Sequence, residues 1–141
     1  MYQNILIPTD LYEENHDLIR KAVEVATTFK GKITLLHVIE LSTTALYAAS
    51  LGFTQFTPPS AEGATLVMRA LGTELGIPEE QQAVDVGRVP FKICEYAKSM
   101  KVDLILLSHP THILPKLLGS TTHTLLQHAP CDVWIVRKTM I

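Results

Sequence analysis

Short apolar runs recur along the chain, and five of them have the composition of buried strands. Each run is rich in Ile, Leu or Val and is bounded by proline, glycine or polar residues, which is typical of strands covered on both faces of a parallel sheet. The clearest is Leu104–Leu107, which contains no polar residue. The predicted strands are Asn4–Pro8, Lys32–Ile39, Ala83–Val86, Leu104–Leu107 and Asp132–Val136.

Segments with a helical spacing of apolar residues separate these strands. In the first segment Leu18, Ala22 and Ala26 fall on one side of a helix. The predicted helices are Glu13–Phe29, Ala61–Leu75, Pro90–Met100 and a short helix that begins at Ser120 and ends before Pro130. Regular alternation of strands and helices predicts an α/β fold, in which one open five-stranded parallel sheet carries helices on both faces. We expect a single domain over residues 1–141.

The segment Leu41–Ser60 is the least regular part of the chain and mixes aromatic residues with Ser, Thr, Gly and two prolines. We expect a loop and a short helix whose aromatic side chains pack on the domain. The alternative is a lid or a partner surface, because a connection of this length is often functional.

Composition narrows the classes of protein to which this chain can belong. Hydrophobic residues make up 47% and charged residues 18%, the net charge is −2 and the sequence pI is about 6.3. This charge predicts no nucleic-acid partner, and no apolar run has the length of a membrane span. The chain enters its first strand without the basic and apolar regions of a signal peptide. Because it has only two cysteines, Cys94 and Cys131, we expect a reduced, cytoplasmic location.

Two segments carry candidate binding chemistry. Loops at the carboxyl ends of strands line the ligand crevice of open α/β sheets, and Thr9 and Asp10 follow the first strand. Asp10 could instead fix a turn or cap a helix. Gly119 and Ser120 open a helix after the fourth strand, where free amides and the helix dipole favour an anion. His37, within the second strand, is interpreted as a core or strand-end histidine.

Recognisable catalytic and metal-binding patterns are missing from the sequence. There is no Gly-x-Gly-x-x-Gly after the first strand, no Walker Gly-Lys-Ser and no nucleophile elbow. The histidines His109, His112, His123 and His128 are interpreted as surface or loop residues, because zinc requires three or four converging ligands. We therefore expect no enzyme activity and no bound metal.

Taken in order, these pieces resemble the universal stress protein family, and the resemblance covers essentially the whole chain. The matching pieces are Ile5–Asp10, Leu35–Val38, Val86–Pro90, Val102–Leu107, Leu118–Ser120 and His128–Val133. The resemblance implies the strand order 3-2-1-4-5 of the adenine-nucleotide alpha-hydrolase-like fold. It also implies a homodimer in which the fifth strands pair. That pairing would cover Val133, Trp134, Ile135 and Val136, an apolar edge that would otherwise promote aggregation, and we expect Trp134 near the contact.

Many members of this family bind ATP, and the resemblance implies a candidate nucleotide pocket. It would consist of Pro8, Thr9, Asp10, Val38, Ser108, Gly119, Ser120 and Thr121. The family signature Gly-x2-Gly-x9-Gly-Ser/Thr is incomplete here, because Ser108 replaces the first glycine and the loop is shorter. Pro110 and Pro115 each fix φ and remove an amide donor. The loop instead resembles that of the A-type branch, which does not bind nucleotide.

Three functions remain open from the sequence. The leading hypothesis is a dimeric cytoplasmic stress-response or signalling module without tight ATP binding and without a cofactor. The second is an ATP-binding switch, with or without slow ATPase activity, in which Asp10 holds the ribose or a metal and Gly119, Ser120 and Thr121 hold phosphates; ATP or AMP would then be the ligand. The third is a flavin or another electron carrier, because one fold hosts many functions.

Overall fold

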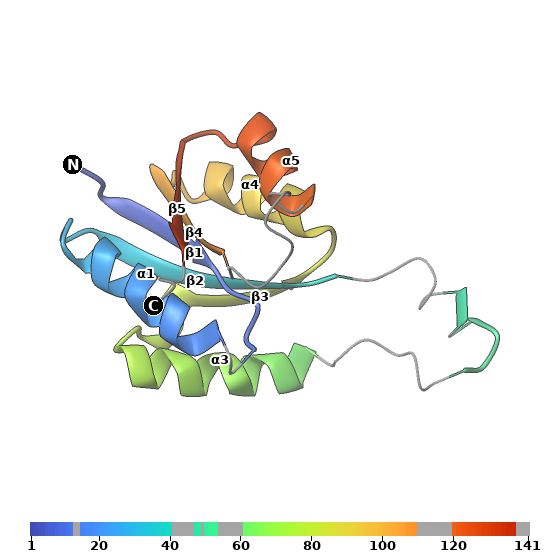
Figure 1. Ribbon diagram of the computed structural model, residues 1–141. Coiled ribbons are helices and arrows are strands. Elements are labelled where there is room, and N and C mark those ends of the chain that lie inside the picture. The colour runs from blue at the N-terminus through green and yellow to red at the C-terminus, as the bar shows by residue number, and fades with distance from the viewer. Residues whose placement is uncertain (13–14, 41–46, 49, 54–60, 110–119, 138–141) are drawn as a thin grey trace.

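Five parallel strands form one sheet in the computed structural model, which describes residues 1–12, 15–40, 47–48, 50–53, 61–109 and 120–137 (Figure 1). The order across the sheet is β3-β2-β1-β4-β5, as the family resemblance implied. The strands are β1 (Asn4–Pro8), β2 (Lys32–Ile39), β3 (Gln82–Val86), β4 (Leu104–His109) and β5 (Asp132–Arg137). The predicted α/β class and strand order are therefore confirmed.

The central strand β1 pairs with β2 on one side and with β4 on the other. The order in which the chain adds strands to the sheet reverses at β1. Ile5 of β1 lies opposite Ile33 of β2 on one side and Leu104 of β4 on the other. The chain fills the sheet from β1 outward to β3 and then crosses back to β4. The helix that follows β1 packs on one face of the sheet and the helix that follows β4 packs on the other, and open α/β sheets form their ligand crevice at such a point.

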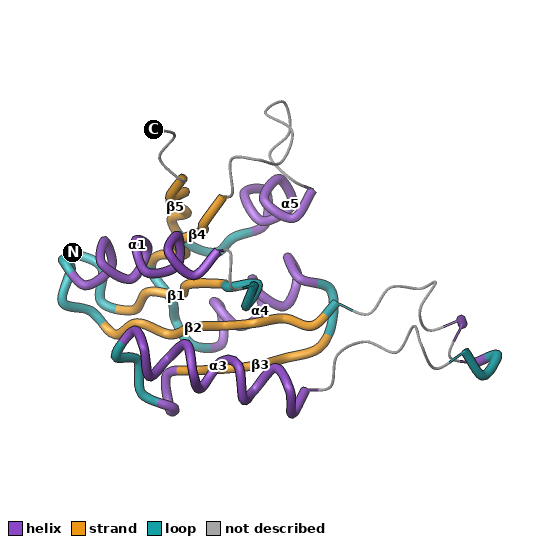
Figure 2. The backbone as a smooth tube through the Cα atoms, turned by 60° about the horizontal axis from the view of Figure 1, so that its bottom comes forward, coloured by secondary structure: helices purple, strands orange, loops and turns teal. Residues whose placement is uncertain are grey.

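Among the helices that the structure describes, two cover each face of the sheet (Figures 1 and 2). The helices α1 and α3 lie on one face, and α4 and α5 lie on the other. The helices are α1 (His16–Thr27), α3 (Ala61–Leu75), α4 (Val89–Ser99) and α5 (Ser120–His128), with a short 3₁₀ helix, η3 (Glu79–Gln81), before β3. Pro90 stands in the first turn of α4, where its missing amide donor costs nothing.

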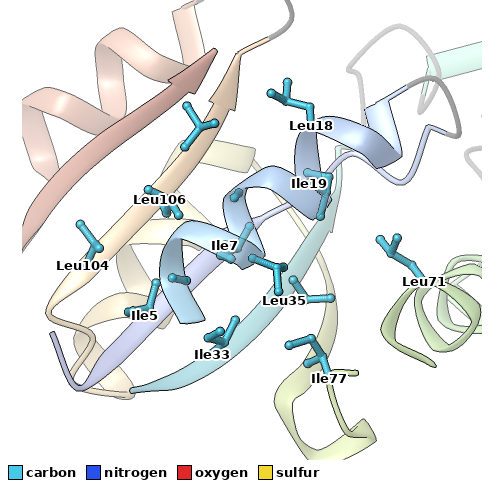
Figure 3. Packing of buried hydrophobic residues seen from close by; sticks show 14 of the residues in the cluster. Ile5, Ile7, Leu18, Ile19, Ile33, Leu35, Leu71, Ile77, Leu104 and Leu106 are labelled. Carbon is cyan, nitrogen blue, oxygen red and sulfur yellow. The ribbon is translucent and has the colours of Figure 1, made fainter. Parts of the chain in front are cut away.

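Alternating strand residues supply two hydrophobic cores. Figure 3 shows the core under α1 and α3, which includes Ile5, Ile7, Ile19, Leu35 and Leu106, each almost completely buried. The residues between them face the second core, which consists of Leu6, Leu36, Val38, Ile93, Cys94, Ala97, Val102, Ile105, Leu107 and Leu125. Strands buried on both faces explain why their sequences are continuously apolar.

The first helix is shorter than its predicted range of Glu13–Phe29. It begins at His16 and ends at Thr27, while Glu13 and Glu14 lie outside the described residues. Phe29 leaves the helix and turns its ring against Tyr2 and Trp134, with ring centroids 5.2 and 5.5 Å away. A tertiary aromatic contact therefore determines the position of Phe29.

The prediction that aromatic residues of Leu41–Ser60 pack on the domain is wrong for those that the structure describes. Tyr47 is 67% exposed and Phe53 is 50% exposed, and the neighbouring Leu51 is also exposed. Residues 41–46, 49 and 54–60, including Phe56, lie outside the described residues. The presence of aromatic residues therefore did not identify a buried face in this segment.

None of the described helices combines the length and the apolarity that are needed to cross a bilayer.

Candidate functional site

A cleft of about 500 Å³ opens at the carboxyl ends of β1, β2 and β4. The ends of these strands and the turn after β1 form its floor, and residues of α4 and α5 form its wall. The lining residues are Pro8, Thr9, Asp10, Tyr12, Leu36, His37, Val38, Ile39, Glu40, Val89, Ile93, Leu107, Ser108, Thr121 and Thr122. The cleft lies at the reversal point of the sheet, as expected for this class of fold.

The turn after β1 is fixed by hydrogen bonds to both of its polar side chains. The Asp10 carboxylate accepts a bond from the Tyr12 amide at 3.0 Å and another from the Asn15 side-chain amide at 2.6 Å. The Thr9 hydroxyl accepts a weaker bond from the Leu11 amide at 3.3 Å. Leu11 has a φ of 66°, a left-handed conformation that costs about 1–2 kcal/mol in a residue with a side chain. These bonds hold the strained turn, so Asp10 has the structural role that the sequence left open.

The same turn is attached to β2 through both backbone groups of Thr9. Its amide donates to the Leu36 carbonyl at 2.8 Å, and its carbonyl accepts a 2.8 Å bond from Nδ1 of His37. A carbonyl can only accept, so Nδ1 of His37 carries a proton and donates this bond. His37 is therefore a strand-end histidine that positions the β1 turn, in agreement with its interpretation from the sequence.

An apolar wall forms the deeper part of the cleft. Val38 and Leu107 come from the ends of β2 and β4, which flank β1, and Val89 and Ile93 come from the first turns of α4. Val38 is 8% exposed and Ile93 is 1% exposed, so the wall is part of the second hydrophobic core. A wall of this kind accepts the flat face of an aromatic ring, while the polar groups at the rim determine its orientation.

The structure brings together six of the eight residues predicted for the nucleotide pocket, namely Pro8, Thr9, Asp10, Val38, Ser108 and Thr121. Ser120 is the first residue of α5, but its side chain is outside the described part, as are Gly119 and the whole loop 110–119. The effect predicted for Pro110 and Pro115 on that loop therefore falls outside the described residues.

Sequence reasoning missed several residues of the lining. They are Tyr12, Val89, Thr122, which adjoins the predicted Thr121, and Glu40, which follows β2 directly. Since ligand crevices gather residues from every adjacent strand end, the position of Glu40 after an apolar run was an available signal. Tyr12, whose side chain is 65% exposed, has no comparable signal.

Within the described residues, no three His, Cys, Asp or Glu side chains are grouped so that they could hold a metal ion. His123 and His128 are exposed on α5, and His112 belongs to the loop outside the described part. His109 is the last residue of β4.

The predicted contact strand β5 lies at an edge of the sheet and pairs with β4 alone among the described strands. Val133 and Ile135 pack on the core under α4 and α5, while Val136 enters the core under α1 and α3. Trp134 is 41% exposed and turns its ring edge-to-face against Tyr2, with centroids 5.4 Å apart. Trp134 thus has an internal packing role that the sequence did not reveal.

Comparison with known proteins identifies the family. The sequence model of the Universal stress protein family matches residues 1–137. Universal stress protein A homolog 2 of Coxiella burnetii is 36% identical over 141 residues, covering 96% of this chain and 95% of the relative. The structure of UspA from Lactobacillus plantarum has a TM-score of 0.70 at 25% identity, covering 96% of this chain and 98% of that chain. A universal stress protein in complex with cAMP shares the fold, with a TM-score of 0.65 at 18% identity over 98% of each chain. This chain belongs to the universal stress protein family.

Proposed function

We propose that this protein is a ligand-binding module of stress response or signalling, that it acts in the cytoplasm as a homodimer, and that it catalyses no reaction. The cleft at the carboxyl ends of β1, β2 and β4 is the observation that carries this proposal. Its ligand is an adenine nucleoside or nucleotide. The solved family member that is in complex with cAMP supports a ligand of this class.

The lining of the cleft suits the base and ribose of such a ligand better than its phosphates. The base lies against the apolar wall of Val38, Val89 and Ile93, where burial of its faces supplies most of the binding free energy. The Asp10 carboxylate retains acceptor capacity beyond its two turn bonds, because an ionised carboxylate has about four lone-pair sites. It can therefore accept a bond from a ribose hydroxyl.

Tight binding of a triphosphate is not part of the proposal. In the sequence, the loop that should surround the phosphates has two prolines and no glycine before Gly119, so it offers fewer amide donors and less left-handed freedom. Among the described lining residues there is no Lys or Arg. Mg·ATP should therefore bind with a Kd weaker than about 10 μM, which corresponds to a binding free energy of about 7 kcal/mol.

Isothermal titration calorimetry with adenosine, AMP, cAMP and Mg·ATP tests the proposal. We expect saturable binding of at least one adenine compound and no tight binding of Mg·ATP. Thr122→Trp, which would fill the cleft from α5, should abolish the binding heat while circular dichroism shows an unchanged fold. The matched control is Thr73→Trp on the exposed side of α3, which should leave binding unchanged. Absence of heat with every adenine compound would reject the proposed ligand class.

The second candidate is an ATP-binding switch, with or without slow ATPase activity. It is favoured by the start of α5 at Ser120 and by Thr121 and Thr122 in the lining, because the amino end of a helix offers free amides to phosphate. Micromolar binding of Mg·ATP that Thr121→Glu abolishes would favour the switch. Multiple-turnover ATP hydrolysis above that of the same variant would show the ATPase activity.

The proposed homodimer forms by pairing of the β5 edges. An uncovered strand edge leaves amide and carbonyl groups without partners, and a two-fold axis lets two identical edges satisfy one another. Sedimentation equilibrium should give twice the chain mass. Alternate residues of a strand direct their amides to opposite sides, so single proline substitutions at Val133, Trp134, Ile135 and Val136 should separate into two classes. One class loses only the dimer, and the other also loses the β4–β5 pairing.

A further inference from the structure

The strand β3 forms the second edge of the sheet, on the side away from β5 (Figure 2). Among the described strands it pairs with β2 alone. The surface around it is formed by residues 61–92, which the structure describes without a gap. A strand edge carries amide and carbonyl groups that have no partner within the sheet, and another extended chain can pair with them.

The backbone amide and carbonyl of Val84 point to this open edge. The Gly87 amide donates to the Ile39 carbonyl of β2 at 3.0 Å, so Gly87 bonds toward β2. Successive residues of a strand direct their backbone groups to opposite sides, so Ala83 and Asp85 also bond toward β2 and Val84 faces away from it. Among the described residues neither backbone group of Val84 has a partner on the open side. Val84 therefore offers one donor and one acceptor.

The edge is closed on either side of Val84. On the amino side, the Gln82 amide donates to the Glu79 carbonyl of η3. On the carboxyl side, the Val86 amide donates to the Asp85 carboxylate at 2.8 Å. Contacts of this kind protect a strand edge from pairing along its whole length. They restrict a partner to a short contact centred on Val84.

A hollow of about 480 Å³ opens beside Val84, between β3, η3 and α3. Met68 lines it and is almost completely buried, and the Val84 side chain packs on the same core. The Arg69 guanidinium forms an ion pair with Glu79 at 2.5 Å, so Glu80 gives the described lining a net negative charge. A long basic side chain suits this lining, because its stem can cover apolar surface while its charged end reaches a carboxylate.

We propose that the β3 edge binds an extended segment of a partner protein, which pairs antiparallel with Val84 and places a Lys or Arg side chain in the hollow beside Glu80. In an antiparallel pair, one residue can exchange both backbone hydrogen bonds with the residue opposite it. The side chains of such a pair lie on the same face of the sheet. The side chain opposite Val84 therefore points to the face that α3 covers, where the hollow opens.

Two parts of this surface have different roles. The backbone bonds to Val84 supply affinity for any extended chain, and the hollow supplies specificity. Pairing of two copies of this chain would set two Val84 side chains opposite each other, and valine carries no charge to match Glu80. Charge complementarity therefore favours a basic segment over a second copy. The hollow shares no residue with the described lining of the cleft, so this proposal does not depend on the cleft ligand.

Fluorescence anisotropy on the full chain with labelled heptapeptides tests the proposal. The peptides alternate Thr and Val around a central Lys, Arg, Ala or Glu, and one further Lys peptide is N-methylated at its central amide. We expect saturable binding of the Lys and Arg peptides and at least about tenfold weaker binding of the Glu peptide. N-methylation should abolish binding, because it removes the donor to the Val84 carbonyl.

Three variants locate the binding surface. Val84→Pro removes the edge amide and should abolish binding of the Lys peptide, and proline is tolerated where a strand amide faces outward. Glu80→Lys should weaken binding of the Lys peptide at least about tenfold, and it decides the matter if Val84→Pro does not fold. Glu24→Lys is the matched control, because Glu24 is exposed on α1 and outside the hollow and the change in net charge is the same. Circular dichroism checks the fold of each variant.

Four results contradict the inference. The first is that no peptide binds with a Kd below about 1 mM. The second is that the Lys peptide binds equally well after N-methylation, and the third is that Glu80→Lys and Glu24→Lys have equal effects. The fourth is that sedimentation equilibrium shows species larger than a dimer that Val84→Pro removes, because a second copy would then occupy the edge. Each of these results leaves the proposed ligand of the cleft unaffected.

Discussion

The Tyr2 hydroxyl donates a 2.7 Å hydrogen bond to the Asp132 carboxylate and so joins the amino-terminal segment to the start of β5. The Tyr2 ring stands edge-to-face against Phe29 and Trp134, with centroids 5.2 and 5.4 Å away. Pairs of this geometry stabilise a fold by about 0.5–1.5 kcal/mol beyond the burial of their surfaces. One side chain thus connects the first strand, the end of α1 and the edge strand.

This contact predicts a loss of stability at alkaline pH. The hydrogen bond to Asp132, followed by burial, raises the pKa of Tyr2 above its ordinary value of about 10. The folded chain therefore binds the phenolic proton more tightly than the unfolded chain does. The stabilisation is complete below about pH 10 and is lost as pH rises through the pKa of the folded state. Urea denaturation from pH 8 to 11 should show this decline.

Two tyrosine variants separate that decline from other alkaline effects. Tyr2→Phe removes the titrating group and should flatten the decline, at the cost of lower stability at pH 8. Tyr47→Phe changes an exposed tyrosine and should keep the full decline. If the free energy of unfolding falls equally steeply with pH in Tyr2→Phe and in the unmodified protein, the decline does not come from Tyr2.

Gly31→Ala should destabilise the protein by about 1–3 kcal/mol through overpacking. A Cβ atom at Gly31 would lie 2.6 Å from the Tyr2 carbonyl oxygen and 2.9 Å from the Gln3 carbonyl carbon, and backbone atoms cannot swing aside. Gly76→Ala is the comparison: it has open space around the new atom but a φ of +73°, so only the backbone cost of about 1 kcal/mol applies. Chemical denaturation should show the larger loss for Gly31→Ala, and the reverse order would refute the steric explanation.

Asp103→Ala should cost about 1–3 kcal/mol, because the Asp103 carboxylate accepts the amides of Gln3 and Asn4, each at 2.9 Å. Asp103→Asn retains one acceptor oxygen and should cost less than alanine. Guanidinium denaturation at pH 7 measures both changes. Equal stability of the alanine variant and the unmodified protein would show that water replaces the carboxylate without loss.

Both cysteines should react slowly with thiol reagents in the folded protein at neutral pH. Burial raises the pKa of the Cys94 thiol, and burial followed by the charge of Asp132 raises the pKa of the Cys131 thiol. Because the thiolate is the nucleophile, a raised pKa lowers the reactive fraction. Labelling at pH 7 should be slow in buffer and rapid for both cysteines in denaturant; fast labelling of Cys94 in buffer would contradict its role as a packing residue.

The fold could be predicted from the sequence because its signals are local and repeated. Runs such as Leu104–Leu107 are buried on both faces, so they carry no polar residue, and Pro90 marks a helix start. The turn residues Thr9 and Asp10 were placed at the cleft for the same reason, since strand ends in this architecture converge on one crevice.

The remaining features depend on contacts between distant segments, which leave no periodic pattern. The bond between His37 and the Thr9 carbonyl joins residues 28 positions apart. The contact between Tyr2 and Trp134 joins the amino-terminal segment to β5, at the other end of the chain. The exposed Tyr47 and Phe53 show the converse, because apolar residues in an irregular segment do not reveal whether a surface is available to cover them.

The position of β1 at the centre of the sheet has a consequence for synthesis on the ribosome. This strand emerges first, yet Ile5 and Leu6 pair with Leu104 and Ile105, which are translated almost a hundred residues later. Until then one side of β1 has no neighbour in the sheet, and slow closure of distant pairings exposes a nascent chain to aggregation. Chaperone demand during translation should therefore persist until β4 has left the exit tunnel, and a chain truncated before it should be insoluble.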